Sequence, residues 1–297
     1  MGTYYSNGCA ANYENTGRCD CQHKMSTIAG IILTTKSTEF ATMAGVTEAA
    51  IQTLIANKAA WPLWQVGETI NNTAEDGVYA LPNGLGSIPT SSAVWDITTM
   101  FQEGVYSHNV LESFKGFSGR AILIDANGLI WGTSPDGVKF KGFEVKNGQV
   151  TNVIAPATNS EVERRGLRLI YSNKDEYRQY RVAIETNWAD TLEGLMDVTV
   201  EYVSLAAAKT SAIVSVERVC DGSPVTGLVS GDFTLVSDGG DTIEITSVTP
   251  GTTSGQYTLA FTALSDDTYL VDMATPATAT TYGYESTGAD TFTVTTA

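Results

Sequence analysis

The spacing of short apolar runs in the last third of the chain constrains its fold more than any other sequence feature. Six such runs lie at 213–219, 233–236, 243–248, 257–261, 269–273 and 292–294. Turn residues separate them, among them Gly222-Ser223-Pro224 and Pro250-Gly251. Short strands at this spacing within about 90 residues predict a small antiparallel β-sandwich.

Hairpin signals dominate the preceding part of the chain. Asn127-Gly128 lies between the apolar runs 121–125 and 129–131, and Asn147-Gly148 follows an alternating run over 138–145. Asn-Gly favours tight β-hairpin turns, so we expect one hairpin at each dipeptide. The alternating runs at 167–171, 180–185 and 198–203 predict further strands, and the apolar run after Thr27 predicts a buried one.

Helices are expected to be the minority. Thr47 is a good helix N-cap, Glu48 favours a helix N-terminus, and apolar residues then recur at helical spacing, which predicts a helix over 47–59. A second short helix is expected near 188–195. The segment from Thr98 to Phe117 fits either a short helix or a pair of strands.

A change in composition near Ala206 suggests a domain boundary. Of 17 basic residues, only Lys209 and Arg218 lie beyond it, while Ser, Thr and Gly become abundant. We therefore expect an N-terminal arm over 1–25, a β-rich main domain over 26–205, and the small sandwich over 206–297. The predicted fold class is mainly β, with a barrel or sandwich as the main domain and one or two helices.

The charge balance limits the partners. With 33 acidic and 17 basic residues the net charge is −16, which disfavours a grip on nucleic-acid phosphates. The acidity either serves solubility alone or suits a conduit wall along which DNA slides without adhering. No stretch reaches the length of a membrane helix, and the first residues lack the regions of a signal peptide, so neither a membrane partner nor classical secretion is expected.

Four potential metal ligands lie close together near the N-terminus: Cys9, Cys19, Cys21 and His23. Zinc favours four such ligands, although Cys9 stands farther from the others than the usual paired spacing. A disulfide from Cys9 to Cys19 or Cys21, or free thiols, are the alternatives. Cys220 stands alone, and we expect it to be a small core residue.

The sequence argues against an enzyme. It has no phosphate-binding loop and no His-Glu-x-x-His, and Gly116-Phe117-Ser118-Gly119 lacks the final glycine of a nucleophile elbow. His23 and His108 are the only histidines, so the commonest general base is scarce. Asp125-x-Asn127-Gly128 resembles part of a calcium loop but is better explained as a turn.

Five arginines form the one basic concentration in the acidic chain: Arg164, Arg165, Arg168, Arg178 and Arg181. They are either a solvated strand face or half of a complementary subunit contact. The tryptophans, Trp61, Trp64, Trp95, Trp131 and Trp188, are either core residues or anchors of an assembly.

A resemblance to known modules rests on the segment 254–261, Ser-Gly-Gln-Tyr-Thr-Leu-Ala-Phe, between Phe233-Thr234-Leu235 and Tyr269-Leu270-Val271. It resembles the bacterial immunoglobulin-like modules appended to phage virion and bacterial surface proteins. The resemblance implies an immunoglobulin-like fold for 206–297.

The whole layout looks like a tailed-phage tail tube or ring protein. That resemblance implies a homo-oligomer, a hexameric ring formed when a β-barrel continues between neighbours, in contact with other virion proteins and with DNA passing through. It also implies synthesis in the host cytoplasm and a place in the virion. The alternatives are a capsid decoration or head fibre protein, and a glycan-binding surface protein with exposed tryptophans.

Overall fold

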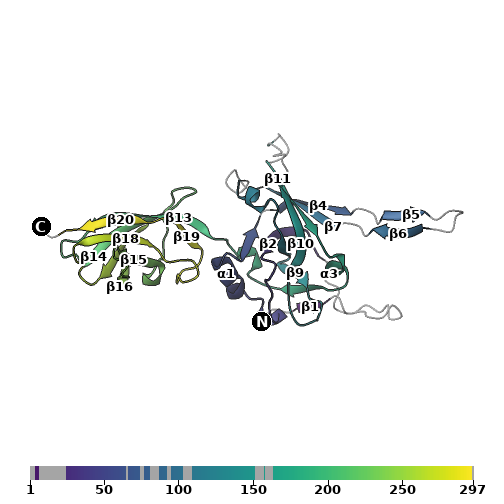
Figure 1. The fold of residues 1–297 in the computed structure, drawn as a ribbon, viewed down its shortest axis with the longest axis horizontal. Coiled ribbons are helices and arrows are strands. Elements are labelled where there is room, and N and C mark those ends of the chain that lie inside the picture. Colours follow the sequence, from purple (N-terminus) through teal and green to yellow (C-terminus); the bar gives the residue numbers. More distant parts are fainter. Residues whose placement is uncertain are drawn as a thin grey trace. The chain divides into compact units, whose positions relative to one another are not determined.

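The computed structural model describes residues 4–6, 25–64, 66–73, 77–80, 87–91, 95–102, 109–150, 157 and 163–295. The fold is mainly β, as predicted (Figure 1). Two compact units make up the chain: one comprises Met1–Leu54 and Lys58–Leu192, the other Ile55–Asn57 and Glu193–Ala297.

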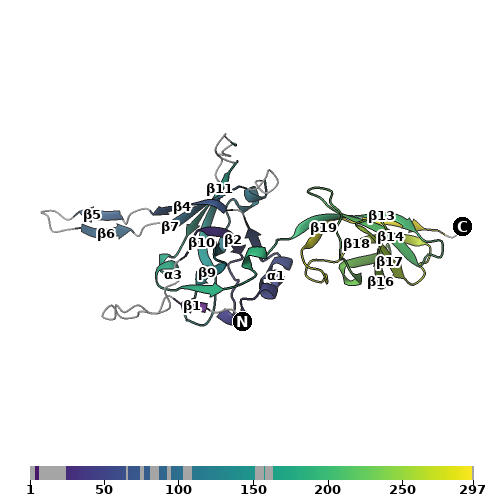
Figure 2. The ribbon, with the colours of Figure 1, turned by 180° about the vertical axis from the view of Figure 1, so that it is seen from behind.

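The first unit is built on a ten-stranded sheet. Its strands are β1 (Tyr4–Ser6), β2 (Ile28–Thr34), β3 (Ala60–Leu63), β4 (Val66–Thr73), β7 (Trp95–Phe101), β8 (Gly119–Asp125), β9 (Leu129–Thr133), β10 (Phe143–Val150), β11 (Arg165–Tyr171) and β12 (Arg181–Glu185). A separate pair, β5 (Gly77–Ala80) and β6 (Ser87–Ser91), continues the β4–β7 hairpin outward from the sheet (Figures 1 and 2).

The order of the strands leaves the sheet open. The path runs β1-β12-β9-β8-β10-β11-β7-β4, with β2 paired to β8 and β3, and among the described residues it does not close into a barrel. The sheet is buried on both faces at its centre, because Leu123 lies in one core cluster while its neighbours Ile122 and Ile124 point the other way and are also buried. Strands buried on both faces explain the continuous apolar runs in this part of the sequence.

The helix predicted over 47–59 is present as α1 (Glu48–Ala56). The hydroxyl of Thr47 accepts a hydrogen bond from the Ala50 backbone N–H at 3.2 Å, which is an N-cap contact. The other described helices are short: α3 (Lys174–Arg178) and the 3₁₀ turns η2 (Met43–Gly45), η4 (Glu112–Phe114), η5 (Ala189–Thr191) and η6 (Ser230–Asp232). The helix expected near 188–195 is thus only η5, and the described part of the ambiguous segment after Thr98 contains most of β7 and η4.

The hairpin predicted at Asn127-Gly128 is confirmed. Strands β8 and β9 pair antiparallel through Leu123↔Trp131 and Ile124↔Ile130. Gly128 takes a positive φ of 76° and donates its backbone N–H to Asp125 O at 2.9 Å. Glycine adopts this left-handed conformation without a steric penalty, so the dipeptide turns the chain here as expected.

The second predicted hairpin, at Asn147-Gly148, is wrong. Strand β10 runs straight through both residues and pairs with β11 beyond a register shift at Val145/Asn147. Gly148 exchanges hydrogen bonds with the preceding loop, donating to Phe117 O and accepting from Gly116 N, both at 2.8 Å. A Cβ at Gly148 would lie 2.9 Å from Phe114 O. Glycine therefore serves close backbone approach here, and no turn forms.

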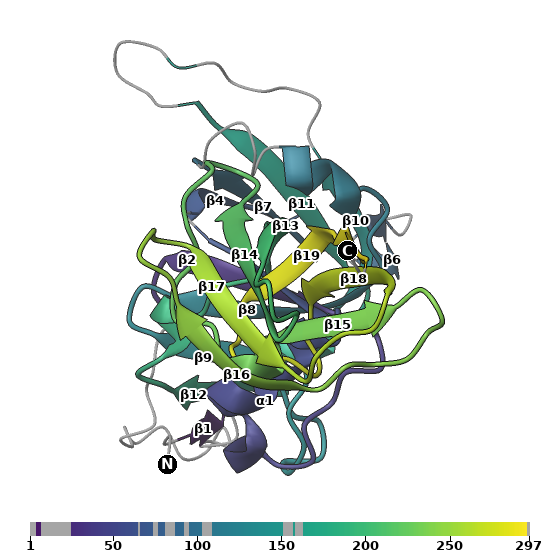
Figure 3. The same ribbon diagram turned by 90° about the vertical axis from the view of Figure 1, so that its left-hand side faces the viewer.

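The second unit is a sandwich of two sheets (Figure 3). One sheet has the order β16-β17-β14-β13-β19 and the other β15-β18-β20. Its strands are β13 (Met196–Leu205), β14 (Ser211–Arg218), β15 (Phe233–Ser237), β16 (Ile245–Pro250), β17 (Gln256–Phe261), β18 (Asp267–Met273), β19 (Tyr284–Gly288) and β20 (Asp290–Val294). Strand β19 pairs parallel with β13 at the margin of the first of these sheets. When the other seven strands are lettered A to G in chain order, the two sheets are A-B-E-D and C-F-G, which is the immunoglobulin arrangement.

The structural boundary between the units differs from the predicted one. The expected boundary at Ala206 falls in the turn between β13 and β14, which pair antiparallel over their length. Val198 and Val200 of β13 are buried in the core of the second unit. The composition changes at Ala206, but the strand before it belongs to the sandwich, so the second unit begins at Glu193.

Candidate functional site

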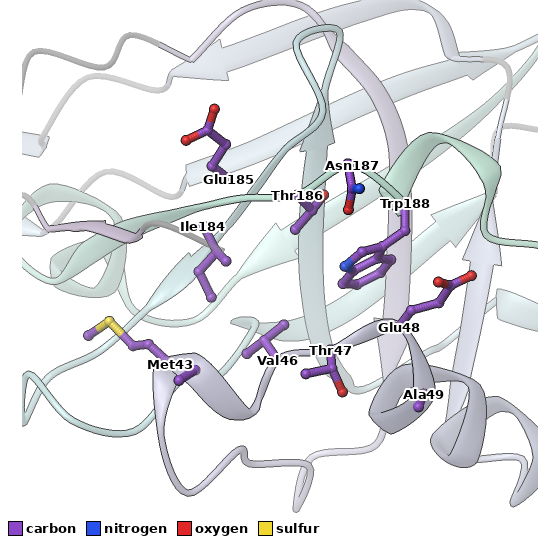
Figure 4. Close-up of a pocket in the computed structure, with 11 residues that line it drawn as sticks. Met43, Val46, Thr47, Glu48, Ala49, Ile184, Glu185, Thr186, Asn187 and Trp188 are labelled. Atoms are coloured by element: carbon purple, nitrogen blue, oxygen red, sulfur yellow. The ribbon is translucent and has the colours of Figure 1, made fainter. Parts of the chain in front are cut away.

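An open groove of about 750 Å³ lies beside the start of α1 in the first unit (Figure 4). One wall is the segment 43–49 and the other is the end of β12 with the residues that follow it, 184–188. Met43, Val46 and Ile184 form a buried apolar floor, and the ring of Trp188 points toward Val46 and Thr47. The groove therefore offers an apolar surface flanked by polar groups.

The polar side chains that line the groove carry mainly carboxylates and hydroxyls. Its lining holds the carboxylates Glu48 and Glu185 but no histidine, cysteine or lysine. The Thr47 hydroxyl already caps α1, and the Thr186 hydroxyl donates to Gly128 O at 2.9 Å. Both threonine hydroxyls of the lining thus already take part in hydrogen bonds within the unit.

The sheet of the first unit ends in a long edge strand. In the part of the chain that the structure describes, β4 pairs with β7 on one side and has no strand on the other. Ile70 lies on this strand and is 42% exposed. Long edge strands with exposed apolar residues are templates for pairing with another chain.

The structure does not bring the five predicted contact arginines together into one patch. Arg165 and Arg168 point to opposite faces of β11, because they are separated by an odd number of positions. Arg165 is buried and forms an ion pair with Glu112, whereas Arg168 pairs with the buried carboxylate of Asp96. The hydrogen bond from Arg168 to Asp96 raises the pKa of the guanidinium.

The remaining three arginines lie elsewhere on the first unit. Arg164 is half-buried just before β11, and Arg178 is exposed at the end of α3. Arg181 begins β12, and its guanidinium contacts two rings, 5.2 Å from the centroid of Trp131 and 4.8 Å from that of Tyr177. Arg165, Arg168 and Arg181 therefore have structural partners within the unit, which the linear sequence could not reveal.

The predicted zinc ligands Cys9, Cys19, Cys21 and His23 lie outside the described residues, as does His108. Among the residues that the structure does describe, no group of three or more His, Cys, Asp or Glu side chains could hold a metal ion. Cys220 is exposed in the turn after β14, so its prediction as a core residue is wrong. The turn begins at Val219, three residues beyond Val216, the last buried valine of β14, so Cys220 lies past the part of the strand that faces the core.

The tryptophans divide between core and surface. Trp131 is buried, Trp61 packs against the same core, and the indole N–H of Trp64 donates to Leu192 O at 2.5 Å. Trp188 lines the groove. Trp61, Trp64 and Trp188 are each partly exposed, and the side chain of Trp95 lies outside the described ones, so the structure leaves open whether any tryptophan anchors an assembly.

Comparison with known proteins does not assign the chain to a family. No protein-family model matches the chain, and no curated protein is detectably similar to it. None of the helices in the described ranges is long and apolar enough to cross a membrane.

Proposed function

We propose that this protein is a non-enzymatic structural subunit of a phage virion, a tail tube or ring component that assembles with copies of itself and carries an immunoglobulin-like module. The observation that carries the proposal is the open, ten-stranded sheet ending in β4. A sheet of this kind can continue from one subunit to the next, as it does in the family that the layout resembles.

Exposed edges are normally blocked in proteins that stay monomeric. Prolines, lysines or a covering loop usually prevent pairing at an edge strand. The eight residues of β4, Val-Gly-Glu-Thr-Ile-Asn-Asn-Thr, contain neither proline nor lysine, and Ile70 adds an exposed apolar side chain. These features support self-assembly through β4.

The charge and the appended module also fit a conduit. The net charge of −16 opposes adhesion to DNA phosphates, and such a lack of adhesion suits a wall past which DNA moves. An immunoglobulin-like module would serve as an exterior appendage in such a virion. Zinc bound by the N-terminal cysteines would stabilise the arm locally and would have no other part in the proposed function. Metal analysis of the purified protein tests whether zinc is bound.

The test is assembly of the purified full-length chain, followed by light scattering and negative-stain electron microscopy. We expect rings or stacked tubes. The variant Ile70→Lys places a charge on the β4 edge and is expected to lower the association constant between subunits about tenfold, equivalent to ~1.4 kcal/mol.

The matched control is Leu270→Lys, because Leu270 is 40% exposed and lies on β18 of the second unit. It should leave assembly unchanged. Equal assembly by wild type and Ile70→Lys would remove β4 from the interface. A wild-type chain that stays monomeric at high concentration would argue instead for a head decoration or glycan-binding protein.

A further inference from the structure

The edge of the sheet opposite β4 is also built to receive a strand. With β1 in place, Val182, Ala183 and Ile184 at the centre of β12 are 2–3% exposed, so both faces of the strand are buried there. Its inner side pairs with β9 over the whole of 181–185. Buried backbone groups need hydrogen-bond partners, so the outer side of β12 requires one as well.

The partner in the structure is the short N-terminal strand β1. It pairs antiparallel with β12 through Tyr4↔Ile184, Tyr5↔Ala183 and Ser6↔Val182. Only three residues make this contact, and residues 7–24 join them to the rest of the unit. A chain of that length spans up to roughly 60 Å when extended, which is enough to reach a neighbouring subunit.

Strand β12, which accepts β1, is also held by contacts that do not involve β1. The guanidinium of Arg181 contacts the rings of Trp131 and Tyr177 at one end of β12. At the other end, the Thr186 hydroxyl donates to Gly128 O, and the backbone N–H of Ser134 donates to Tyr180 O at 2.8 Å beside the start of the strand. A donor strand can therefore leave and be replaced without rebuilding the acceptor.

We infer that assembled copies exchange this strand, so that Tyr4–Ser6 of one copy pairs with β12 of the next. The inference rests on the proposed self-assembly, because a neighbouring copy must lie within reach. Exchange replaces the intrachain hydrogen bonds with identical ones between chains, so it costs little and ties neighbouring subunits together. The ligand of the β12 edge is thus an extended N-terminal segment of a second copy.

Disulfide trapping between two differently labelled chains tests the exchange. In a background with all four cysteines replaced by serine, one chain carries Ser6→Cys and another, of different mass through an affinity tag, carries Val182→Cys. Paired residues on antiparallel strands have Cα atoms ~4.5–5.5 Å apart, within the range of a disulfide. Mixing the two chains under assembly conditions and then oxidising them should give a covalent heterodimer on a non-reducing gel.

The off-register control replaces Val182→Cys with Glu185→Cys, about 10 Å farther along the same strand. It should give little heterodimer. A single chain carrying both Ser6→Cys and Val182→Cys should close internally when dilute and link into multimers when assembled. Internal closure under both conditions, with no mixed dimer, would overturn the exchange even if rings form. If the chain forms no rings, the same mixing at high concentration still decides between internal and exchanged pairing.

If the chain with all four cysteines replaced by serine fails to fold, a second experiment uses a truncated chain that lacks residues 1–6 and keeps its remaining native cysteines. A fluorescent peptide of residues 1–7 should bind this chain and bind the intact chain more weakly, because the intact chain already occupies β12. Failure of the peptide to bind the truncated chain would contradict an acceptor edge on β12.

Discussion

At the residue scale, the buried carboxylate of Asp125 explains why the first hairpin forms. It accepts hydrogen bonds from the backbone N–H groups of Ser26, Asn127 and Leu129 and from the indole N–H of Trp131, at 2.9–3.2 Å. Replacing it with Asn presents an amide N–H₂ to some of these donors. We expect Asp125→Asn to lower the free energy of unfolding by about 3 kcal/mol, measured by urea denaturation.

Asp136 provides the matched control at the same scale, because its carboxylate also accepts backbone hydrogen bonds, from Val138 and Lys139, but is fully exposed. The backbone N–H of Val138 is the main reason that its pKa is lowered. Asp136→Asn should cost far less stability than Asp125→Asn, since water replaces the lost contacts. Similar losses in the two variants would show that burial does not determine the role of Asp125.

At the element scale, the two Asn-Gly dipeptides show what the sequence could and could not predict. Both carry the same turn signal, yet only Gly128 has a positive φ. Local sequence encodes the tendency to turn, whereas the loop that packs on Gly148 comes from residues about thirty positions earlier. The α1 helix and most strands were predictable because their signals are local. The continuation of β10 through Asn147-Gly148 was not predictable, because it depends on contacts with a loop that is distant in sequence.

This difference gives a prediction for Gly148→Ala. The new Cβ would meet Phe114 O at 2.9 Å and the Phe117 Cβ at 3.1 Å, so the loop must shift. We expect a loss of about 1–3 kcal/mol in the free energy of unfolding. Gly137→Ala is the control: its φ is +72° with no atom within 4 Å of the new Cβ, so only backbone strain of ~1 kcal/mol applies. If the two variants lost the same free energy of unfolding, the backbone of β10 would be able to shift at Gly148 and make room for the new Cβ at little cost.

At the scale of the whole molecule, the surfaces that we propose for assembly were the hardest to find in the sequence. The arginine concentration is conspicuous in sequence, but Arg165, Arg168 and Arg181 have partners inside the first unit. Strand β4 at one end of the sheet, and strand β12 beneath the three-residue β1 at the other, carry no comparable signal, because a strand's place in the sheet depends on strands that are distant in sequence. The groove beside α1 likewise joins segments about 140 positions apart.

The boundary between the units provides the last prediction. A fragment of 193–297 contains β13, so we expect it to fold alone and unfold cooperatively on heating, as followed by circular dichroism. A fragment of 206–297 lacks Val198 and Val200, and burial of two valines is worth about 3–6 kcal/mol. That loss approaches the whole stability of a small domain, and it also leaves β14 without its hairpin partner. The shorter fragment should therefore show no cooperative transition. A transition at the same temperature in both fragments would place the start of the sandwich after β13, where composition alone had put it.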